Sequence, residues 1–118
     1  MTFYAKCLAA DLQLSPYSSM PFAVADAEKD RILHARLSTG SILLMASDNR
    51  PGMPFSQGNN ISINIACENL EEIERLYAAL LEGGTATMPL HDAFWGARFG
   101  MLIDRFGIPW MLNLLQTP

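Results

Sequence analysis

His34 and Arg36 are the first residues whose types could support chemistry. They alternate with the apolar side chains of segment 31–37. Successive side chains of a strand point to opposite faces, so both would lie on the face away from the core. His34 could contact a ligand, or could hydrogen-bond a neighbour on a wet sheet face. Arg36 could clamp an anionic substrate through two parallel hydrogen bonds, or could pair with a nearby carboxylate.

Three neutral polar residues form a second candidate group. Ser62 and Asn64 alternate with isoleucines in segment 60–66, and Asn113 is the only polar residue in segment 109–115. In strands, Ser62 and Asn64 would point away from the core. They could contact a ligand, or could form the solvated side of an edge strand. Asn113 could contact the same ligand, or could satisfy backbone groups at the end of the sheet.

No catalytic residue is predicted. The sequence shows no Ser-His-Asp order, no paired catalytic carboxylates and no Gly-rich phosphate loop after a strand. The two cysteines, Cys7 and Cys67, have no Cys or His at metal-ligand spacing. Glu68 beside Cys67 does not lower a thiol pKa, so Cys67 is no candidate nucleophile.

Composition narrows the class of protein. The chain has 118 residues, half of them hydrophobic, which suits one compact domain with its own core. Its net charge of -4 offers no basic surface to nucleic acid. No apolar run approaches the roughly 20 residues of a membrane span, and no secretory leader is recognisable. Two cysteines suit a reducing compartment. We therefore expect a cytoplasmic protein without nucleic-acid or membrane partners.

Hydrophobic periodicity predicts an α+β fold of two helices and seven strands. The expected helices cover residues 1–10 and 70–81, and the expected strands cover 12–17, 31–37, 42–46, 60–66, 85–88, 97–103 and 109–115.

The clearest elements are the second helix and the last hairpin. Asn69 can cap the helix, with Glu72 reaching back as in a capping box. Its apolar stripe begins at Leu70, and the isoleucines of 60–66 are expected to pack under it. Gly107 supplies the permissive backbone of the hairpin turn.

The chain contains a weak internal repeat. Residues 60–118 are predicted to run strand, helix and three strands, whereas residues 1–48 begin at the helix, with a linker at 49–59. Segment 39–45 aligns with segment 106–112. The missing first strand would leave a sheet edge open, and a second copy of the chain is the expected cover, which predicts a homodimer.

Several short motifs, together with the duplicated unit, carry a family resemblance. They are His34-Ala35-Arg36-Leu37 with Ser47-Asp48, Phe94-Trp95-Gly96 through Phe99-Gly100, Asp104-Arg105-Phe106-Gly107 and Trp110-Met111-Leu112-Asn113. The chain resembles the vicinal oxygen chelate superfamily of glyoxalases, bleomycin-resistance proteins and extradiol dioxygenases. Within it, the chain is similar to the PhnB-like, or demethylubiquinone methyltransferase-like, group. This implies cupped antiparallel sheets with helices outside and a small-molecule cleft inside.

The resemblance also implies where a site would lie. The expected ligand contacts are His34, Arg36, Ser62, Asn64 and Asn113 around one cavity, with Trp95 and Phe94 at its mouth or as packing residues. The metal ligands of relatives would fall near Ser62, Asn113 and Leu43. Neutral Ser and Asn and apolar Leu are poor ligands for a transition metal. We therefore predict neither a metal nor another cofactor.

Three functions stay open at this point. The first hypothesis is a PhnB-like protein that binds a small molecule without the metal site of the family. The second is a metal-dependent lyase or dioxygenase-type enzyme with atypical ligands, His34 among them. The third is a truncated relative whose role is assembly. Neither the ligand nor any reaction is predicted from the sequence.

Overall fold

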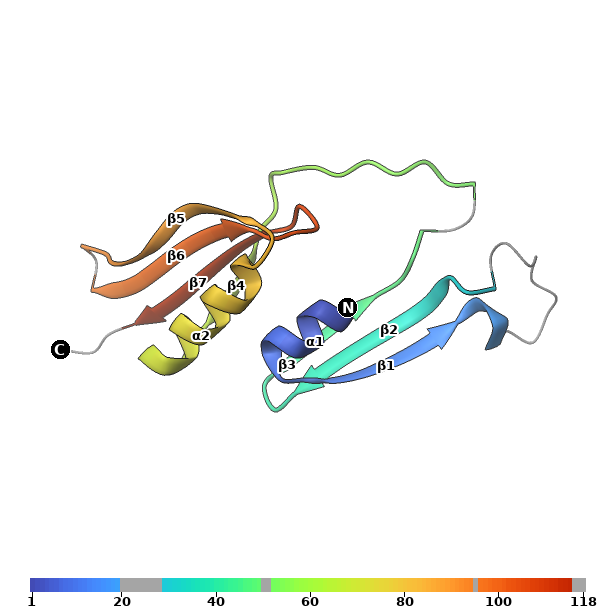
Figure 1. The fold of residues 1–118 in the computed structure, drawn as a ribbon, viewed down its shortest axis with the longest axis horizontal. Helices are drawn as coiled ribbons and strands as arrows, with labels where there is room; N and C mark the ends of the chain where they lie inside the picture. Colours follow the sequence, from blue (N-terminus) through green and yellow to red (C-terminus); the bar gives the residue numbers. More distant parts are fainter. Residues whose placement is uncertain (20–28, 50–51, 95, 116–118) are drawn as a thin grey trace. The chain divides into compact units, whose positions relative to one another are not determined.

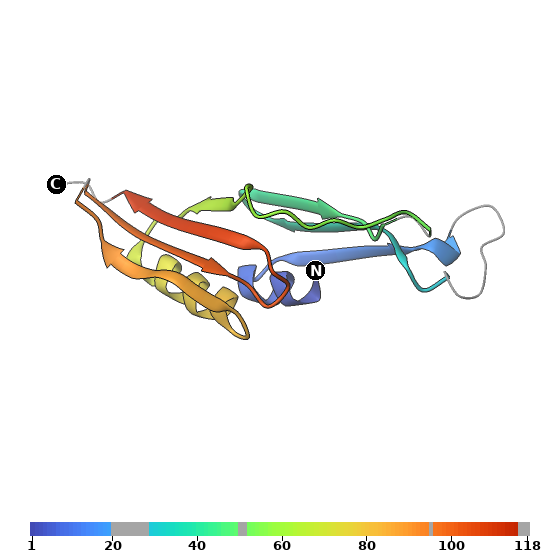
Figure 2. The same ribbon diagram turned by 90° about the horizontal axis from the view of Figure 1, so that it is seen from above.

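The computed structural model describes residues 1–19, 29–49, 52–94 and 96–115, which fall into two units, Met1–Ser56 and Gln57–Pro118. The first unit contains α1 (Thr2–Leu8), β1 (Asp11–Pro16), a short 3-10 helix (Tyr17–Ser19), β2 (Ile32–Thr39) and β3 (Ile42–Ala46) (Figures 1 and 2). The second contains β4 (Ile63–Ala66), α2 (Leu70–Leu81), β5 (Thr85–Asp92), β6 (Ala97–Ile103) and β7 (Pro109–Leu115). The predicted order of elements is confirmed. The loop expected at 18–30 lies largely outside the described residues, and the union of both units in one domain stays a prediction.

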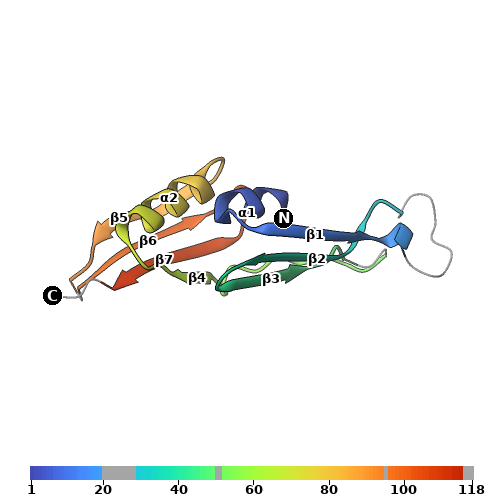
Figure 3. The same cartoon turned by 90° about the horizontal axis from the view of Figure 1, so that it is seen from below.

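The first unit is an antiparallel sheet of order β1-β2-β3, with α1 on one face (Figure 3). Ala35 and Leu37 of β2 are buried, and Leu37 lies opposite Leu44 of β3. His34 and Arg36 are exposed. The alternation in this strand is therefore confirmed.

The second unit is a sheet of order β4-β7-β6-β5, with α2 packed on β5, β6 and β7. The pairing of β4 with β7 is parallel, whereas an antiparallel sheet was expected. The three strands after α2 run back and forth, which brings β7 beside β4 in the same direction. Ile73 and Leu80 of α2 are fully buried under this sheet.

The N-terminus of α2 confirms the predicted cap and corrects its detail. The Asn69 side chain accepts a hydrogen bond from the Glu72 N–H at 2.8 Å. The Glu72 carboxylate, however, accepts from the Glu68 N–H at 3.3 Å, one residue earlier than a capping box requires. Leu70 is half exposed, contrary to expectation, because it lies at the first position of the helix.

The hairpin β6–β7 has the predicted bounds and is closed by Asp104, which is only 3% exposed. One carboxylate oxygen of Asp104 accepts hydrogen bonds from the N–H groups of Phe106 (2.8 Å) and Ile108 (3.0 Å). The other oxygen accepts from Nε1 of Trp110 at 2.7 Å. Gly107 has a φ of 83°. A buried carboxylate therefore holds both the turn and the Trp110 side chain of β7.

Two strand boundaries differ from expectation. The strand expected at 60–66 begins at Ile63, and Ile61 is 78% exposed rather than packed under α2. Ile63 pairs with Trp110, so an earlier pair would need an N–H from Pro109, which proline lacks. The strand expected at 85–88 continues to Asp92 as β5.

The two halves of the chain share the order of their helices and strands, but the residue-by-residue alignment predicted from the sequence does not match equivalent positions. Aligning 39–45 with 106–112 matches Leu43 to Trp110, yet Leu43 is 49% exposed and Trp110 is 1% exposed. Two residues join β2 to β3, whereas five join β6 to β7. The two connections differ in length by three residues. Because side chains along a strand alternate between faces, an odd difference in connection length puts the aligned residues on opposite faces of their sheets.

Candidate functional site

The second sheet has an open face, opposite the face on which α2 packs. Opposite residues of paired strands share a face, and Trp110, Leu112 and Leu102 are buried on the helix side. The intervening residues form two rows across the four strands, here called the open face. The first row is Ala66, Asn113, Phe99 and His91, and the second row is Asn64, Met111, Met101 and Met88.

The first row has an unpaired acceptor near its centre. The main-chain carbonyl of Asn113 accepts a hydrogen bond from the Cys67 N–H at 2.7 Å. The side-chain Oδ1 of Asn113 is buried and has no hydrogen-bond partner among the residues that the structure describes. Beyond Phe99, the His91 ring stands edge-on to the Phe99 ring, with centroids 6.4 Å apart. This row thus combines an aromatic edge with an oxygen that can accept a donor.

The second row consists mainly of methionines. Met88, Met101 and Met111 lie on the neighbouring strands β5, β6 and β7, and Asn64 continues the row on β4. Met101 and Met111 are half-buried, and Met88 is exposed. Methionine is flexible and polarisable, and it contacts aromatic rings favourably.

The first sheet presents a different open face. Arg36 lies between Gln13 and Met45, and His34 lies beside Ser15. Within the described ranges, Arg36 takes part in no ion pair. This face therefore combines charged and polar side chains with the exposed Leu43 and Met45, whereas the methionine row carries no charged residue.

Of the predicted site residues, Asn64 and Asn113 share the open face of the second sheet, whereas His34 and Arg36 belong to the first unit. Ser62 is exposed and precedes β4. Trp95 lies outside the described residues. A cavity shared by all of them stays a prediction. Sequence reasoning missed the methionines, Phe99 and His91, since it ended the strand before them at residue 88 and assigned no faces to 97–103.

The described residues do not fit a transition-metal site of the family. Among them, no group of three His, Cys, Asp or Glu side chains is close enough to hold a metal ion. The open face offers the amides of Asn64 and Asn113 and a single imidazole, and amides are poor ligands for such metals. The metal-free state itself stays a prediction.

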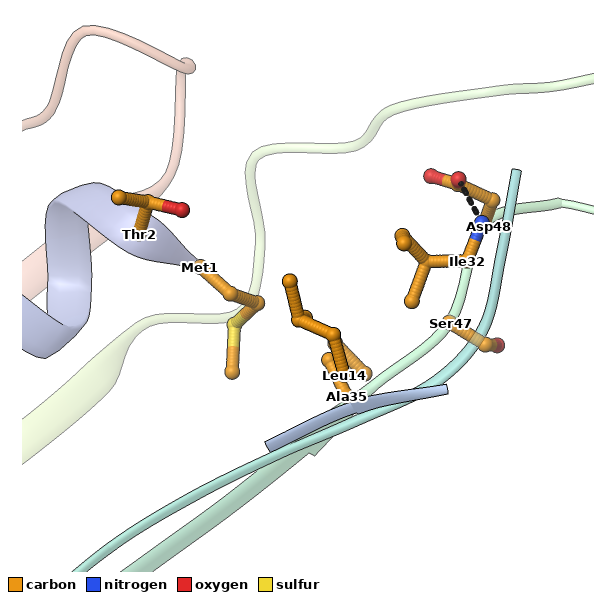
Figure 4. A pocket seen from close by; sticks show the side chains of 8 residues that line it. Met1, Thr2, Leu14, Ile32, Ala35, Ser47 and Asp48 are labelled. Carbon is orange, nitrogen blue, oxygen red and sulfur yellow. Dashed lines mark hydrogen bonds between the residues drawn. The ribbon is translucent and has the colours of Figure 1, made fainter. Parts of the chain in front are cut away.

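A pocket of about 200 Å³ lies in the first unit, on the helix side of the sheet (Figure 4). At its rim, the Asp48 carboxylate accepts a hydrogen bond from the Ile32 N–H at 2.7 Å. Leu14 and Ala35 line it, so it lies on the face opposite His34 and Arg36. This pocket is therefore not the cleft that the resemblance implies. None of the described helices has the length and apolarity needed to span a membrane.

Cys67 makes the stability of the second unit dependent on alkaline pH. Burial, followed by the nearby Glu72 carboxylate, raises the pKa of the Cys67 thiol to about 12. The unfolded thiol ionises near its ordinary value, so above about pH 9 the unfolded chain holds fewer protons than the folded one. Stability is therefore expected to fall as pH rises, by about 2–3 kcal/mol between pH 9 and 11. Urea unfolding across this range measures the loss.

The matched variant for this expectation is Cys67→Ala. Burial also raises the pKa of Tyr77, which acts in the same direction and remains in the variant. In Cys67→Ala, most, though not all, of the decrease in stability with rising pH should therefore be lost. An unchanged slope would show that Cys67 is not its source.

Comparison with known proteins finds one matching family model and several similar solved structures. A family model described as 3-demethylubiquinone-9 3-methyltransferase matches residues 1–113. The crystal structure of protein PA1353 from Pseudomonas aeruginosa is 44% identical, with a TM-score of 0.86, covering 98% of this chain and 86% of that one. The PhnB protein from Bacillus cereus, a putative 3-demethylubiquinone-9 3-methyltransferase, is 26% identical, with a TM-score of 0.74 and coverage of 97% and 87%.

A more distant structure shows the fold alone. The glyoxalase/bleomycin resistance protein from Albidiferax ferrireducens is 17% identical, with a TM-score of 0.61, covering 98% of this chain and 85% of that one.

Proposed function

Because the chain belongs to the PhnB-like family of the glyoxalase/bleomycin-resistance fold, we propose that it binds a small molecule on the open face of the second sheet, without the family's metal site. Asn64 and Asn113 are the proposed polar contacts. His34 and Arg36 lie on the open face of the first sheet, in the other unit, and their roles as ligand contacts stay predictions from the sequence. Ser62 and Trp95 remain predictions from the sequence.

The observation that carries this proposal is the row of methionines beside an unpaired amide oxygen. A sheet packed on one side by a helix normally carries polar side chains on the other. Here the side opposite α2 presents Met88, Met101 and Met111 next to Phe99. Burying them and supplying a donor to Asn113 would both be favourable.

Methyl transfer is not the reaction that we propose, although a methyltransferase is named in the family description. A nucleotide-type methyl donor would need a binding loop such as the Gly-rich turn after a strand, and the sequence has none. A metal-dependent enzyme is the alternative, and it would need ligands around His34.

Methionine methyl resonances test the proposed site directly. In a screen of small acids and antibiotics, a ligand is expected to shift the methyl signals of Met88, Met101 and Met111 in a protein labelled with ¹³C-methyl methionine. The signal of Met53 serves as an internal control, since Met53 does not lie on this face. Asn113→Ala should weaken binding about tenfold. A screen in which no compound shifts the three methyl signals would refute the site.

We propose further that the chain is a homodimer that pairs through the outer edge of β3. In the described part of the first unit, no strand pairs with this edge, whereas β4 covers β7 in the second unit. Segment Ile42–Ala46 contains no Lys or Pro of the kind that protects exposed edges. Antiparallel pairing of two β3 strands around Leu44 would put Leu43 opposite Met45 of the partner subunit.

Metal analysis and solution mass, taken from one freshly purified sample, test both proposals. A metal-free dimer at micromolar concentration is the expected result. Met45→Lys should give a monomer, because it places a charge at each end of the paired edge. Met53→Lys is the matched control, since Met45 and Met53 are 60% and 59% exposed. A monomeric wild type would refute the dimer, and one metal ion per chain would revive the metal-dependent alternative.

A further inference from the structure

We propose that the ligand of the open face is an uncharged, flat aromatic molecule that carries one N–H or O–H group. This inference rests on the function proposed above and adds the chemical class of the ligand.

The first argument is charge. The paired strand residues of the open face include no Asp, Glu, Lys or Arg. The charges of these strands lie on the other face, where Arg98 contacts Asp92 at 3.3 Å and Glu74 of α2 at 3.5 Å. An ionised ligand would lose hydration on the open face without gaining a partner. The first sheet differs, because its open face carries the charged side chain of Arg36.

The second argument is shape. Three adjacent strands place Met88, Met101 and Met111 across a width of roughly 10 Å, since neighbouring strands lie about 4.8 Å apart. This width matches two or three fused or linked rings. Sulfur–aromatic contacts favour a ring laid over thioethers, and Phe99 adds an aromatic neighbour in the next row.

The third argument is hydrogen bonding. In the described part of the chain, Asn113 Oδ1 has no hydrogen-bond partner, and the paired strand residues of the open face include no Lys or Arg that could donate to it. The oxygen is covered, so a ligand donor reaches it only when a neighbouring side chain moves. Met111, two residues away on the same face, has the rotatable bonds to do so. The geometry therefore favours a ligand with an N–H or O–H group at this position.

A pair of dyes that share their rings and differ by one anionic sulfonate group tests the class. N-phenyl-1-naphthylamine and 8-anilino-1-naphthalenesulfonate share the same rings and the same N–H, and the second adds a sulfonate. The neutral dye is expected to bind at least tenfold more tightly by fluorescence titration, and to shift the methyl signals of Met101 and Met111.

The possible failures are distinguishable. Equal or tighter binding of the sulfonate at the same methyl groups would overturn the ligand class and leave the proposed function intact. If screened compounds shift these methyl signals but the neutral dye does not, the ligand class is likewise overturned and the proposed function is left intact. If no compound binds this face, both fail.

Two variants sharpen the test. Met101→Lys puts a cation at the centre of the open face. It should weaken binding of the neutral dye at least tenfold while strengthening binding of the sulfonate. Met53→Lys should change neither affinity. N-methyl-N-phenyl-1-naphthylamine, which lacks the N–H, should bind wild type about tenfold more weakly than its parent, and Asn113→Ala should bind the two equally. A tenfold difference that persists in Asn113→Ala would exclude Asn113 as the acceptor.

Discussion

Asp104→Ala is expected to lower the free energy of unfolding by about 3–5 kcal/mol, one of the two largest effects expected in this chain. The substitution removes the acceptor for the N–H groups of Phe106 and Ile108 and for Nε1 of Trp110. Trp110 is almost fully buried, so its N–H would be left without water as a substitute. Urea unfolding followed by tryptophan fluorescence measures the loss.

Asp104→Asn separates the two halves of this network. An amide oxygen can still accept from Phe106 and Ile108, but the amide NH₂ would face the Trp110 N–H, so a donor would meet a donor. We expect an intermediate loss of about 1–3 kcal/mol. If Asp104→Ala unfolds within 1 kcal/mol of wild type, the buried carboxylate does not hold the hairpin.

This hairpin shows how far sequence reasoning reaches. The apolar strands and Gly107 predicted its bounds correctly, because turn chemistry is local. The bond from Trp110 to Asp104 was not predicted, since it links residues that meet only when the turn length and strand register are known. The motif Asp104-Arg105-Phe106-Gly107 first served as a family marker, and it has a physical role in closing the turn.

The candidate site was predicted in part, for a similar reason. Alternation within single strands correctly placed His34 and Arg36 opposite the buried residues of β2, and Asn64 opposite Ile63 and Ile65. The methionine row depends instead on the register between strands. That register contains irregularities at 86–88 and 88–91 of β5, which no alternation pattern reveals. Ser62 lies before β4 because Pro109 in the partner strand ends the ladder, and its role as a ligand contact stays a prediction.

Gly84→Ala is the second substitution with a large expected effect. Gly83 and Gly84 both follow the end of α2, but they differ in backbone conformation and surroundings. Gly83 has a φ of +78°, whereas Gly84 has ordinary backbone angles and lies against the end of β6. A Cβ at Gly84 would overlap the Ile103 carbonyl oxygen and lie 2.9 Å from Cα of Asp104. Neither atom belongs to a side chain that could rotate away, so the start of β5 must move.

We expect Gly84→Ala to cost about 3 kcal/mol, because backbone must shift beside the buried Asp104 network. Gly83→Ala should cost only about 1–2 kcal/mol, the ordinary strain of a left-handed residue. Gly40→Ala is the control, since nothing lies within 4 Å of its Cβ position and its φ is not positive. Urea unfolding of the three variants should therefore rank Gly84 above Gly83 and Gly83 above Gly40. Equal losses at Gly83 and Gly84 would mean that the close approach of Gly84 to the backbone of Ile103 and Asp104 adds no cost of its own.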